Sequence, residues 1–366
     1  MRNDTQYATF EVRPTSHPRT LTERTAALAE LSFGTVFSDH MAHAVWTPER
    51  GWHDHRVEAY GPISLDPAAA VLHYAQEIFE GLKAYRHADG SVWAFRPEAN
   101  AARFAASARR LALPELSEAE FLHSIEVLVH TDVDWVPGVP GSSLYLRPFM
   151  FASEAFLGVR SARRVDYLVI ASPSGPYFTT GFTPVSIWVA EDYHRSGPGG
   201  TGAAKCGGNY AASLLPQRQA YEQGCEQVCF LDAATNTRLE ELGGMNMFVV
   251  TADGAVHTPA LTGTILEGVT RSSILRLLAE AGREVHERPI TLTEVKDGVT
   301  SGAISEMFAC GTAAVITPIG HLKGNGFHLT VSGGDAGPVT SELHQALTDI
   351  QYGHREDTHG WMRRLV

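Results

Sequence analysis

The chain has 366 residues, of which 44% are apolar and 19% charged, and its formal net charge is −12. This length fits two domains better than one, and the apolar fraction is sufficient for a core in each. The excess of acidic residues, without runs of Lys or Arg, argues against a protein that binds nucleic acid or an anionic membrane.

The first half of the chain mixes segments of helical and strand character. Apolar positions at mixed helical spacing predict a helix over 71–85 that ends near Gly81. Apolar runs rich in β-branched or aromatic residues predict strands over 91–95, 143–151 and 165–171. Amphipathic runs predict helices over 98–113, where Pro114 stops the first of them, and over 118–130.

A stretch without charge separates the two halves. Residues 172–184 concentrate Pro, Gly, Ser and Thr, which is typical of a linker. We therefore expect a domain over 1–174, a linker over 175–185 and a second domain over 186–366. In the second domain the sequence predicts strands over 185–190 and 227–231, helices over 209–221 and 270–281, and a hairpin around the turn pair Asp253-Gly254.

The most unusual segment is the glycine-rich run over 197–210, GPGGTGAAKCGGNY. Its first six residues match the Gly-x-Gly-x-x-Gly fingerprint of nicotinamide-dependent oxidoreductases, although that fingerprint should join a strand directly to a helix. A phosphate-binding Walker A loop does not fit, because Cys206 follows Lys205 where Ser or Thr should bind a metal.

Lys205 supports a third interpretation of this run. Its neighbours are Ala-Ala and Cys-Gly-Gly, and no carboxylate is close in sequence. Such a lysine can be desolvated, which lowers the pKa of its amine and makes it a nucleophile able to form a Schiff base. From these residues alone, a solvated loop lysine is the favoured interpretation, since lysines are mostly exposed.

Neither a disulfide framework nor a metal centre is expected. The four cysteines are too few for a disulfide scaffold in a chain of this length, so we expect reduced thiols. His40, His43, His53 and His55 have no cysteine nearby and do not show the spacing of a zinc site. The amino-terminal residues lack the apolar stretch of a signal peptide, and no apolar run is long enough to span a membrane, so we expect a cytoplasmic protein.

Several further motifs accompany the lysine. The carboxy-terminal half contains Glu241-Leu-Gly-Gly-Met-Asn246, Val256-x-Thr258, Leu266-x-Gly268-Val269-x-Arg271 and Gly311-Thr312-Ala313, and the amino-terminal half contains Phe79-Glu80-Gly81-Leu-Lys83, Phe95-Arg96-Pro97 and Tyr145-Leu-Arg147-Pro148. Together with Lys205-Cys-Gly-Gly-Asn-Tyr210, they resemble the class IV pyridoxal-phosphate aminotransferases, and among these the branched-chain amino acid aminotransferases. The resemblance implies an α/β (α+β) fold of type IV, with a smaller α/β domain, a larger cofactor-binding domain built around a barrel-like sheet, and a homodimer.

The resemblance also implies roles for individual residues. Lys205 would be the catalytic lysine and would carry pyridoxal 5′-phosphate. The other residues expected to bind the cofactor are Arg96, Tyr210, Glu241, Val269, Thr270 and Thr312. Those expected to bind substrate are Phe33, Tyr74, Phe79, Tyr145, Arg147, Thr312 and Ala313.

The implied reaction is a reversible ping-pong transfer of an amino group. L-leucine, L-isoleucine or L-valine would exchange its amino group with 2-oxoglutarate, giving a branched 2-oxo acid and L-glutamate, without a metal. The alternatives are another class IV enzyme, either a D-amino acid aminotransferase or an aminodeoxychorismate lyase, and, more remotely, the nicotinamide-dependent oxidoreductase. The sequence leaves the preferred branched substrate and the physiological direction open.

Overall fold

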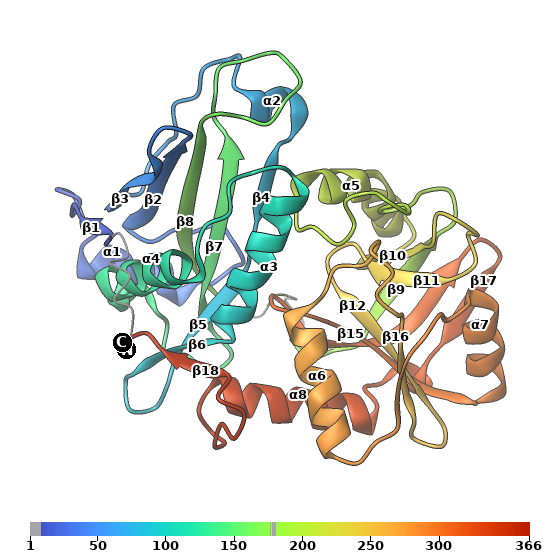
Figure 1. Ribbon diagram of the computed structural model, residues 1–366. Helices are drawn as coiled ribbons and strands as arrows, with labels where there is room; N and C mark the ends of the chain where they lie inside the picture. The colour runs from blue at the N-terminus through green and yellow to red at the C-terminus, as the bar shows by residue number, and fades with distance from the viewer. Residues whose placement is uncertain (1–8, 176, 178–180) are drawn as a thin grey trace, which may run out of the picture. The chain divides into compact units, whose positions relative to one another are not determined.

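The computed structural model describes residues 9–175, 177 and 181–366, and it divides the chain into two compact units. The first unit comprises residues 1–177, 204–207 and 350–366, and the second comprises residues 178–203 and 208–349. Each unit is built on a nine-stranded sheet with helices packed on it, which is the mixed α/β architecture that the sequence predicts (Figure 1). No helix in the described ranges is long and apolar enough to cross a membrane.

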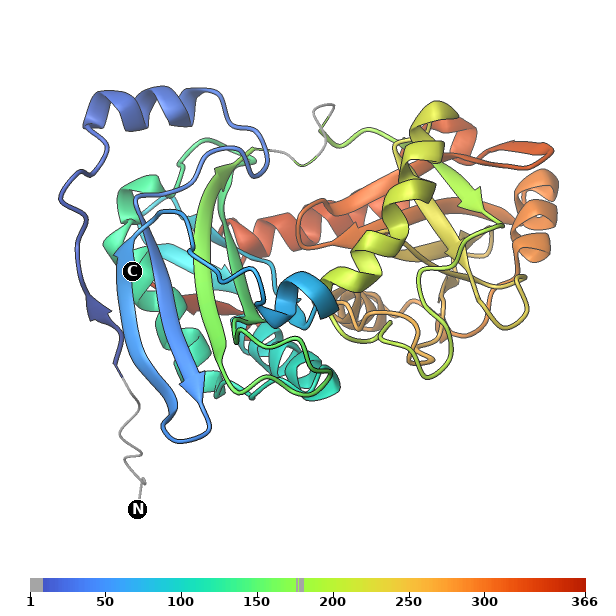
Figure 2. The ribbon, with the colours of Figure 1, turned by 90° about the horizontal axis from the view of Figure 1, so that it is seen from above.

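The sheet of the first unit has the strand order β1-β3-β2-β8-β7-β5-β6-β18, with β4 added alongside β7. Its strands are β1 (Glu11–Val12), β2 (His40–Thr47), β3 (Gly51–Ala59), β4 (Glu77–Phe79), β5 (Leu82–Arg86), β6 (Val92–Phe95), β7 (Ser143–Ala152), β8 (Val165–Ser174) and β18 (Met362–Arg364). Its helices are α1 (Leu21–Ala29), α2 (Ala70–Tyr74), α3 (Pro97–Arg110) and α4 (Glu118–Thr131). The long strands β7 and β8 pair antiparallel along their whole length and lie side by side in Figure 2.

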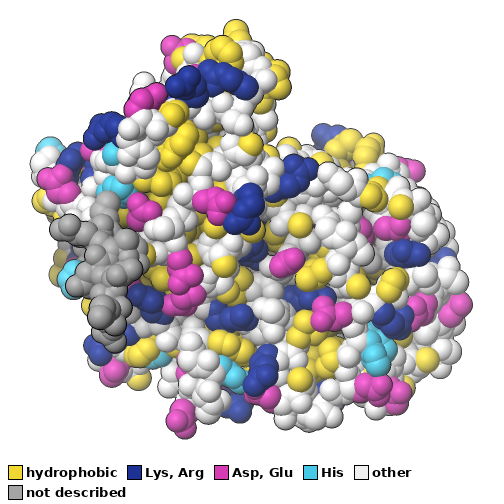
Figure 3. All heavy atoms as spheres, in the orientation of Figure 1, with side chains coloured by type: hydrophobic (Ala, Val, Ile, Leu, Met, Phe, Trp, Pro, Cys, Tyr) yellow, Lys and Arg dark blue, Asp and Glu magenta, His cyan; other side chains and the backbone are white. Residues whose placement is uncertain are grey.

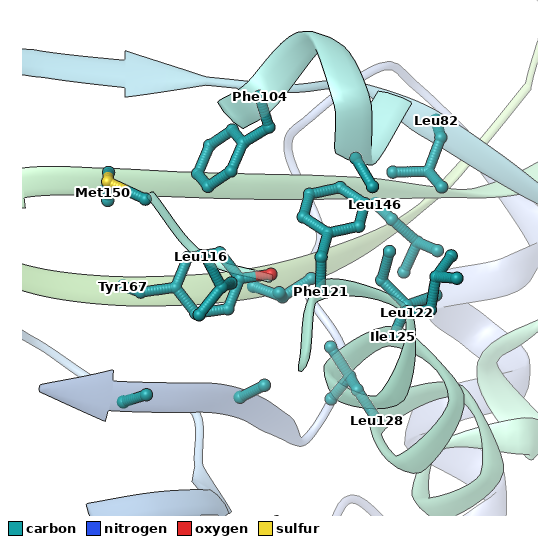
Figure 4. Close-up of a cluster of buried hydrophobic side chains, with 14 of the residues drawn as sticks. Leu82, Phe104, Leu116, Phe121, Leu122, Ile125, Leu128, Leu146, Met150 and Tyr167 are labelled. Atoms are coloured by element: carbon teal, nitrogen blue, oxygen red, sulfur yellow. The ribbon is translucent and has the colours of Figure 1, made fainter. Parts of the chain in front are cut away.

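The two faces of this sheet have different environments because successive side chains on a strand point to opposite faces. Leu82 on β5 and Leu146 on β7 belong to one buried cluster with Phe104 of α3 and Phe121 of α4 (Figure 4). Helices α3 and α4 therefore cover this face. Tyr145, the residue before Leu146 on β7, points to the opposite face.

The predicted helix over 71–85 is wrong beyond its first turn. Helix α2 ends at Tyr74, where Ala75 takes a left-handed conformation with φ of 47°. The following residues form β4, which pairs with β7, and β5, which pairs with both β6 and β7. Their apolar side chains are spaced for a helix, but pairing with the sheet, a contact distant in sequence, decides their conformation.

The sheet of the second unit has the order β11-β10-β9-β16-β15-β12-β13-β14, with β17 beside β16. Its strands are β9 (Val185–Ala190), β10 (Gln227–Leu231), β11 (Leu239–Leu242), β12 (Asn246–Thr251), β13 (Val256–Thr258), β14 (Val285–Glu287), β15 (Ile304–Gly311), β16 (Val315–Gly324) and β17 (Phe327–Thr330). The first residues of β16 pair with β15 and its later residues pair with β9. One long strand thus joins two sets of strands, and the sheet curls into a half-barrel around an apolar core.

The helices of this unit are α5 (Gly207–Glu222), α6 (Val269–Glu280), α7 (Leu292–Ser301) and α8 (Pro338–Gln351). Helices α5 and α6, strands β9 and β10 and the hairpin of β12 and β13 confirm the elements predicted for 185–281. In the first unit, β6, β7, β8, α3 and α4 are likewise confirmed, although α3 ends at Arg110 rather than near residue 113.

The boundaries of the units differ from the predicted domains at the carboxy terminus. Residues 350–366 belong to the first unit because β18 pairs antiparallel with β6. Their return makes the first unit the longer one, whereas the sequence predicts it to be the smaller. The predicted linker over 175–185 overlaps β9 at Val185, and its residues 176 and 178–180 lie outside the described residues.

The core of the first unit yields a test of stability. Phe121 is 1% exposed, and replacing it with Ala leaves a cavity that costs about 3–5 kcal/mol of the free energy of unfolding. We expect Phe121→Ala to lower the urea midpoint of the first unit. The matched control is Val139→Ala, at a side chain that is 60% exposed, where the change should stay within about 0.5 kcal/mol. Equal losses in both variants would contradict this assignment of the core.

Candidate active site

The residues expected at the site occur in both units, and each group is described within its own unit. The first unit contains Phe33, Tyr74, Phe79, Arg96, Tyr145, Arg147 and Lys205. The second contains Tyr210, Glu241, Val269, Thr270, Thr312 and Ala313.

Lys205 is fixed through its main chain. Its amide donates a hydrogen bond to the hydroxyl of Ser107 on α3 at 2.9 Å, and its carbonyl accepts one from the amide of Phe79 on β4 at 2.9 Å. Two residues later, the Gly207 amide donates to the carboxylate of Glu77. The Nζ atom lies 4.8 Å from the centre of the Phe79 ring. The position of this lysine is thus set by backbone contacts that do not use its amine.

An ion pair accompanies the lysine. Glu80 is fully buried and accepts two hydrogen bonds from the Arg103 guanidinium, at 2.7 and 2.9 Å, and a third from Asn100 at 2.8 Å. Burial by itself raises the pKa of Glu80, but the positive charges of Arg103 and Lys205, together with these hydrogen bonds, outweigh it and lower the pKa. Glu80 therefore stays ionised and contributes negative charge beside the lysine.

Arg96 has different surroundings from those of Arg103. It precedes α3 in a left-handed conformation with φ of 49°, and its guanidinium lies over the Trp361 ring, 5.4 Å from the ring centre. Burial lowers the pKa of Arg96. Arg103 is seven residues further along, on the helical face that also carries Asn100 and Ser107, and this face contacts Lys205.

Arg147 and Tyr145 form an aromatic and cationic cluster with Phe79. The guanidinium of Arg147 lies 4.8 Å from the centre of the Phe79 ring and donates to the Tyr145 hydroxyl at 3.2 Å. Its Nε is buried and has no hydrogen-bond partner in the described part of the chain. A Cβ atom at Gly81 would overlap the Tyr145 hydroxyl, so this position requires glycine. The cluster presents an unused donor that suits a carboxylate.

Phe33 and Tyr74, the other two residues of the first unit that are expected to bind substrate, have different surroundings. Phe33 packs edge-on against Tyr145, with ring centres 4.8 Å apart, and so extends the cluster. Tyr74 lies at the end of α2, is 43% exposed and donates a hydrogen bond to the carbonyl of Leu157. The structure therefore brings Phe33, Phe79, Tyr145 and Arg147 together, whereas the contacts of Tyr74 are with the loop between β7 and β8.

In the second unit, Glu241 has a buried carboxylate that several partners hold in place. It lies on β11, is 2% exposed and pairs with Arg195 at 2.8 Å. The amide of Leu266 donates to the same carboxylate oxygen at 2.8 Å, and Asn246 reaches the other oxygen at 3.5 Å. A buried ion pair with these additional donors holds one orientation of the carboxylate.

Val269 and Thr270 are the first two residues of α6, as predicted. No side chain caps this helix, whose N-cap is Gly268. A Cβ atom at Gly268 would overlap the side-chain oxygen of Asn246, so a side chain there would displace the start of the helix. The first amides of a helix have no intrahelical acceptor and favour an anion.

Tyr210 and the Thr312-Ala313 pair occupy loops or helix ends of the same unit. Tyr210 lies in the first turns of α5, with its ring near Gly244, in the turn between β11 and β12. Thr312 and Ala313 form the turn between β15 and β16, which closes at Val315 with φ of 61°. Both sites are partly exposed.

The glycine run over 197–202 does not have the context of a dinucleotide fingerprint. Strand β9 ends at Ala190 and α5 begins at Gly207, so the run does not join a strand to a helix. Gly202 instead packs on the main chain of Thr264, where a Cβ atom would overlap the carbonyl oxygen. The remote oxidoreductase alternative therefore loses the feature on which it rested.

Sequence reasoning missed the groups that hold the expected residues in place. Arg195 lies in none of the sequence motifs described above. It pairs with Glu241, which is 46 positions further along the chain. Asn100, Arg103 and Ser107 follow the helical spacing of three and four residues, a signal that could have been combined with the neighbouring Phe79-Glu80-Gly81 motif.

Comparison with known proteins identifies the family of the chain. Residues 77–322 match the family model described as Amino-transferase class IV. The chain belongs to the class IV aminotransferase family.

Individual relatives of the chain indicate which members of this family it resembles. The chain is 54% identical over 359 residues to a probable branched-chain-amino-acid aminotransferase of Streptomyces coelicolor, covering 98% of this chain and 99% of that protein. It is 52% identical to the branched-chain-amino-acid aminotransferase of Mycolicibacterium smegmatis, covering 97% and 98%. The solved branched-chain amino acid aminotransferase of Escherichia coli is 27% identical with a TM-score of 0.74, covering 89% of this chain and 100% of that one.

The ion pair between Arg195 and Glu241 gives a further test. Arg195→Leu leaves a buried carboxylate without its counter-charge, which costs about 3–5 kcal/mol of the free energy of unfolding. We expect a clear loss in urea unfolding of the second unit. Arg218→Leu is the control, because Arg218 and Glu222 form an exposed pair worth at most about 1 kcal/mol. A loss in Arg195→Leu no larger than in the control would show that the pair does not hold the unit together.

Proposed function

We propose that the protein is a branched-chain-amino-acid transaminase that uses pyridoxal 5′-phosphate. It transfers the amino group of L-leucine, L-isoleucine or L-valine to 2-oxoglutarate and releases a branched 2-oxo acid and L-glutamate. The observation that carries this proposal is the backbone-fixed Lys205 beside an aromatic and cationic cluster whose Arg147 has an unused buried donor. High identity over nearly the full length of the branched-chain enzymes supports the substrate class.

The residues present fit this cofactor. A backbone-fixed lysine offers an amine, Glu241 offers a buried carboxylate, and the start of α6 offers the positive end of a helix to a phosphate. When bound, the cofactor supplies an aldehyde and an electron-accepting ring, which is the chemistry that amino-group transfer requires. We assign Tyr210 and Thr312 to its hydroxyl and phosphate groups, as the resemblance implies.

The chain's own groups then have separate tasks. The freed amine of Lys205 would remove the proton from the α carbon of the amino acid and deliver it to the carbon that was the cofactor's aldehyde carbon, so one group would serve first as base and then as acid. Glu241, kept in place by Arg195, holds a proton at the ring nitrogen by favouring the positively charged form. The turn at Thr312 and Ala313 receives the α-carboxylate.

The substrate pocket has to accept both an apolar side chain and the distal carboxylate of glutamate. We assign the apolar part to Phe33, Phe79 and Tyr145, with Tyr74 as a further member. Arg147 takes the distal carboxylate through its buried, unpartnered Nε. When an apolar substrate is bound, the guanidinium stays over the rings of Phe79 and Tyr145.

We further propose a homodimer in the cytoplasm. In the first unit, exposed apolar side chains gather on α2 and on the loop between β7 and β8, at the top of Figure 3. They are Leu72 at 59% exposure, Tyr74 at 43%, Leu157 at 60% and Val159 at 86%. An apolar group of this kind is typical of a surface that another subunit covers.

Turnover of L-leucine with 2-oxoglutarate tests the function directly. We expect glutamate to form from L-leucine and not from D-alanine, and Lys205→Ala to lower kcat by about three orders of magnitude, within the range of a lost general base. Lys296→Ala, at a lysine on α7, is the control and should retain full activity. The proposal fails if no L-branched amino acid is a substrate, and the D-amino acid alternative gains if D-alanine is.

Measurements of cofactor binding can distinguish the role of Arg96, which precedes α3, from that of Arg103, which lies within it. We propose that Arg96 holds the phosphate, as the resemblance implies, whereas the guanidinium of Arg103 is engaged in the buried ion pair with Glu80. Charge-assisted hydrogen bonds worth about 1.5–3 kcal/mol predict that Arg96→Met weakens cofactor binding by about 10- to 100-fold, whereas Arg103→Lys, which keeps the positive charge beside Glu80, changes it less than about threefold.

Titration of the cofactor by its visible absorption measures both effects. Arg96→Lys is made in parallel to keep the positive charge, and it should recover part of the lost affinity. The reverse order, with Arg103→Lys the weaker binder, would contradict the assignment of the phosphate to Arg96.

A further inference from the structure

A second pocket lies wholly within the second unit and contains none of the residues assigned above. Its volume is about 150 Å³, and its lining includes Arg238, Glu240, Pro259, Thr262, Ile265 and Pro289. A cavity of about this volume holds a molecule the size of a six-carbon ring. The pocket therefore suits a small metabolite rather than a nucleotide.

Glu240 supplies the negative group of this pocket. It precedes Glu241 on β11, so the two carboxylates point to opposite sides of the strand. Glu240 is 6% exposed, and one of its oxygens accepts a hydrogen bond from the Thr264 hydroxyl. Its Oε2 atom is buried and has no hydrogen-bond partner in the described ranges of the chain. A buried carboxylate oxygen in this state calls for a donor that the chain itself does not provide.

Arg238 supplies the positive group. It lies two residues before Glu240 and so faces the same side. The carboxylate of Asp232 fixes the main chain here by accepting hydrogen bonds from the amides of Thr235, Thr237 and Arg238. In the part of the chain that the structure describes, the Arg238 guanidinium has no hydrogen bond or ion pair, so its charge is available at the exposed rim.

The walls between these two charges are apolar. Pro259, Ile265 and Pro289, together with Ala233 and Ala260, line the pocket. A ligand that matches all three features carries an ammonium, a carboxylate and a short hydrocarbon group. Neither a simple cation nor a simple anion uses both charges.

We propose that this pocket is a second binding site for a small α-amino acid with an apolar side chain, whose ammonium pairs with Glu240 and whose carboxylate pairs with Arg238. The site is separate from the proposed active site and goes beyond the proposed reaction. The occupant belongs to the same chemical class as the amino acids that the active site is proposed to use.

The groups around Glu240 act on its pKa in opposite directions. Burial raises the pKa of Glu240, and Asp232 acts in the same direction, whereas the Thr264 hydroxyl, Arg195 and His194 oppose the change. A bound ammonium adds positive charge beside the carboxylate and favours its ionised form.

Equilibrium dialysis of the holoenzyme against radiolabelled 1-aminocyclopentanecarboxylic acid tests the proposal. This amino acid has no α hydrogen, so transamination cannot consume it. We expect Arg238→Gln and Glu240→Gln each to bind one equivalent per chain fewer than the wild type, or to bind it at least tenfold more weakly. Cyclopentanecarboxylic acid and cyclopentylamine, which each lack one charged group, should compete at least tenfold more weakly than the amino acid.

Two controls show whether a loss of amino acid binding comes from the second pocket itself. Arg109→Gln, at an exposed arginine of the first unit, should bind like the wild type. If Glu240→Gln fails to fold, Arg238→Gln decides alone, because its side chain is at the surface. Equal binding by the wild type and the folded variants, or no binding at all, overturns the second site. Neither result bears on the transaminase activity, which is measured separately with L-leucine.

Discussion

The structure depends on holding one lysine in place through hydrogen bonds to its main chain. A lysine side chain has four rotatable carbon segments and is usually mobile, so a reactive amine has to be positioned from its backbone. Here the amide and the carbonyl of Lys205 are each hydrogen-bonded, one to α3 and the other to β4. The lysine thus belongs to the first unit, although the chain on both sides of residues 204–207 belongs to the second.

Two buried ion pairs extend this arrangement. Breaking a buried pair costs about 3–5 kcal/mol, although a well-packed apolar replacement of both partners is often neutral, so such pairs are better explained by position than by stability. The Glu80 and Arg103 pair places charge beside the lysine, and the Arg195 and Glu241 pair orients a carboxylate in the other unit. An acidic protein can in this way build local fields that suit an anionic cofactor and anionic substrates.

The sequence predicts most of this fold where a signal is local. Helices α3 to α6 and strands β6 to β10 follow from periodicity and turn residues, and the expectations for Lys205 and Glu241 come from the family resemblance. The wrong predictions concern segments whose conformation depends on contacts with residues distant in sequence. Residues 77–86 have helical spacing but complete a sheet through β7, and residues 362–364 return to the first unit because β6 offers a free edge.

The same limit explains the missed site residues. The expectation for Arg96 rests on its Phe-Arg-Pro context and stays a prediction, but the sequence could not show that its guanidinium lies over the ring of Trp361, a residue far away in the sequence. Arg103 and Arg195 owe their positions to Glu80 and Glu241, and a single sequence cannot show those pairings. A motif can thus predict which groups carry the chemistry, whereas the ion pairs that hold two of these segments in place are visible only in the structure.

The consecutive carboxylates Glu240 and Glu241 show how one strand can serve two sites. Alternation along β11 sends Glu241 to Arg195 and Glu240 to the second pocket, yet the charge of Arg195 acts on both carboxylates. An ammonium bound at Glu240 would therefore change the field at Glu241 without touching it. Because coupling between two binding sites is reciprocal, binding of the cofactor at its proposed site beside Glu241 would alter the affinity of the proposed second site by the same factor. Under these two proposals, two adjacent residues of one short strand link the two sites.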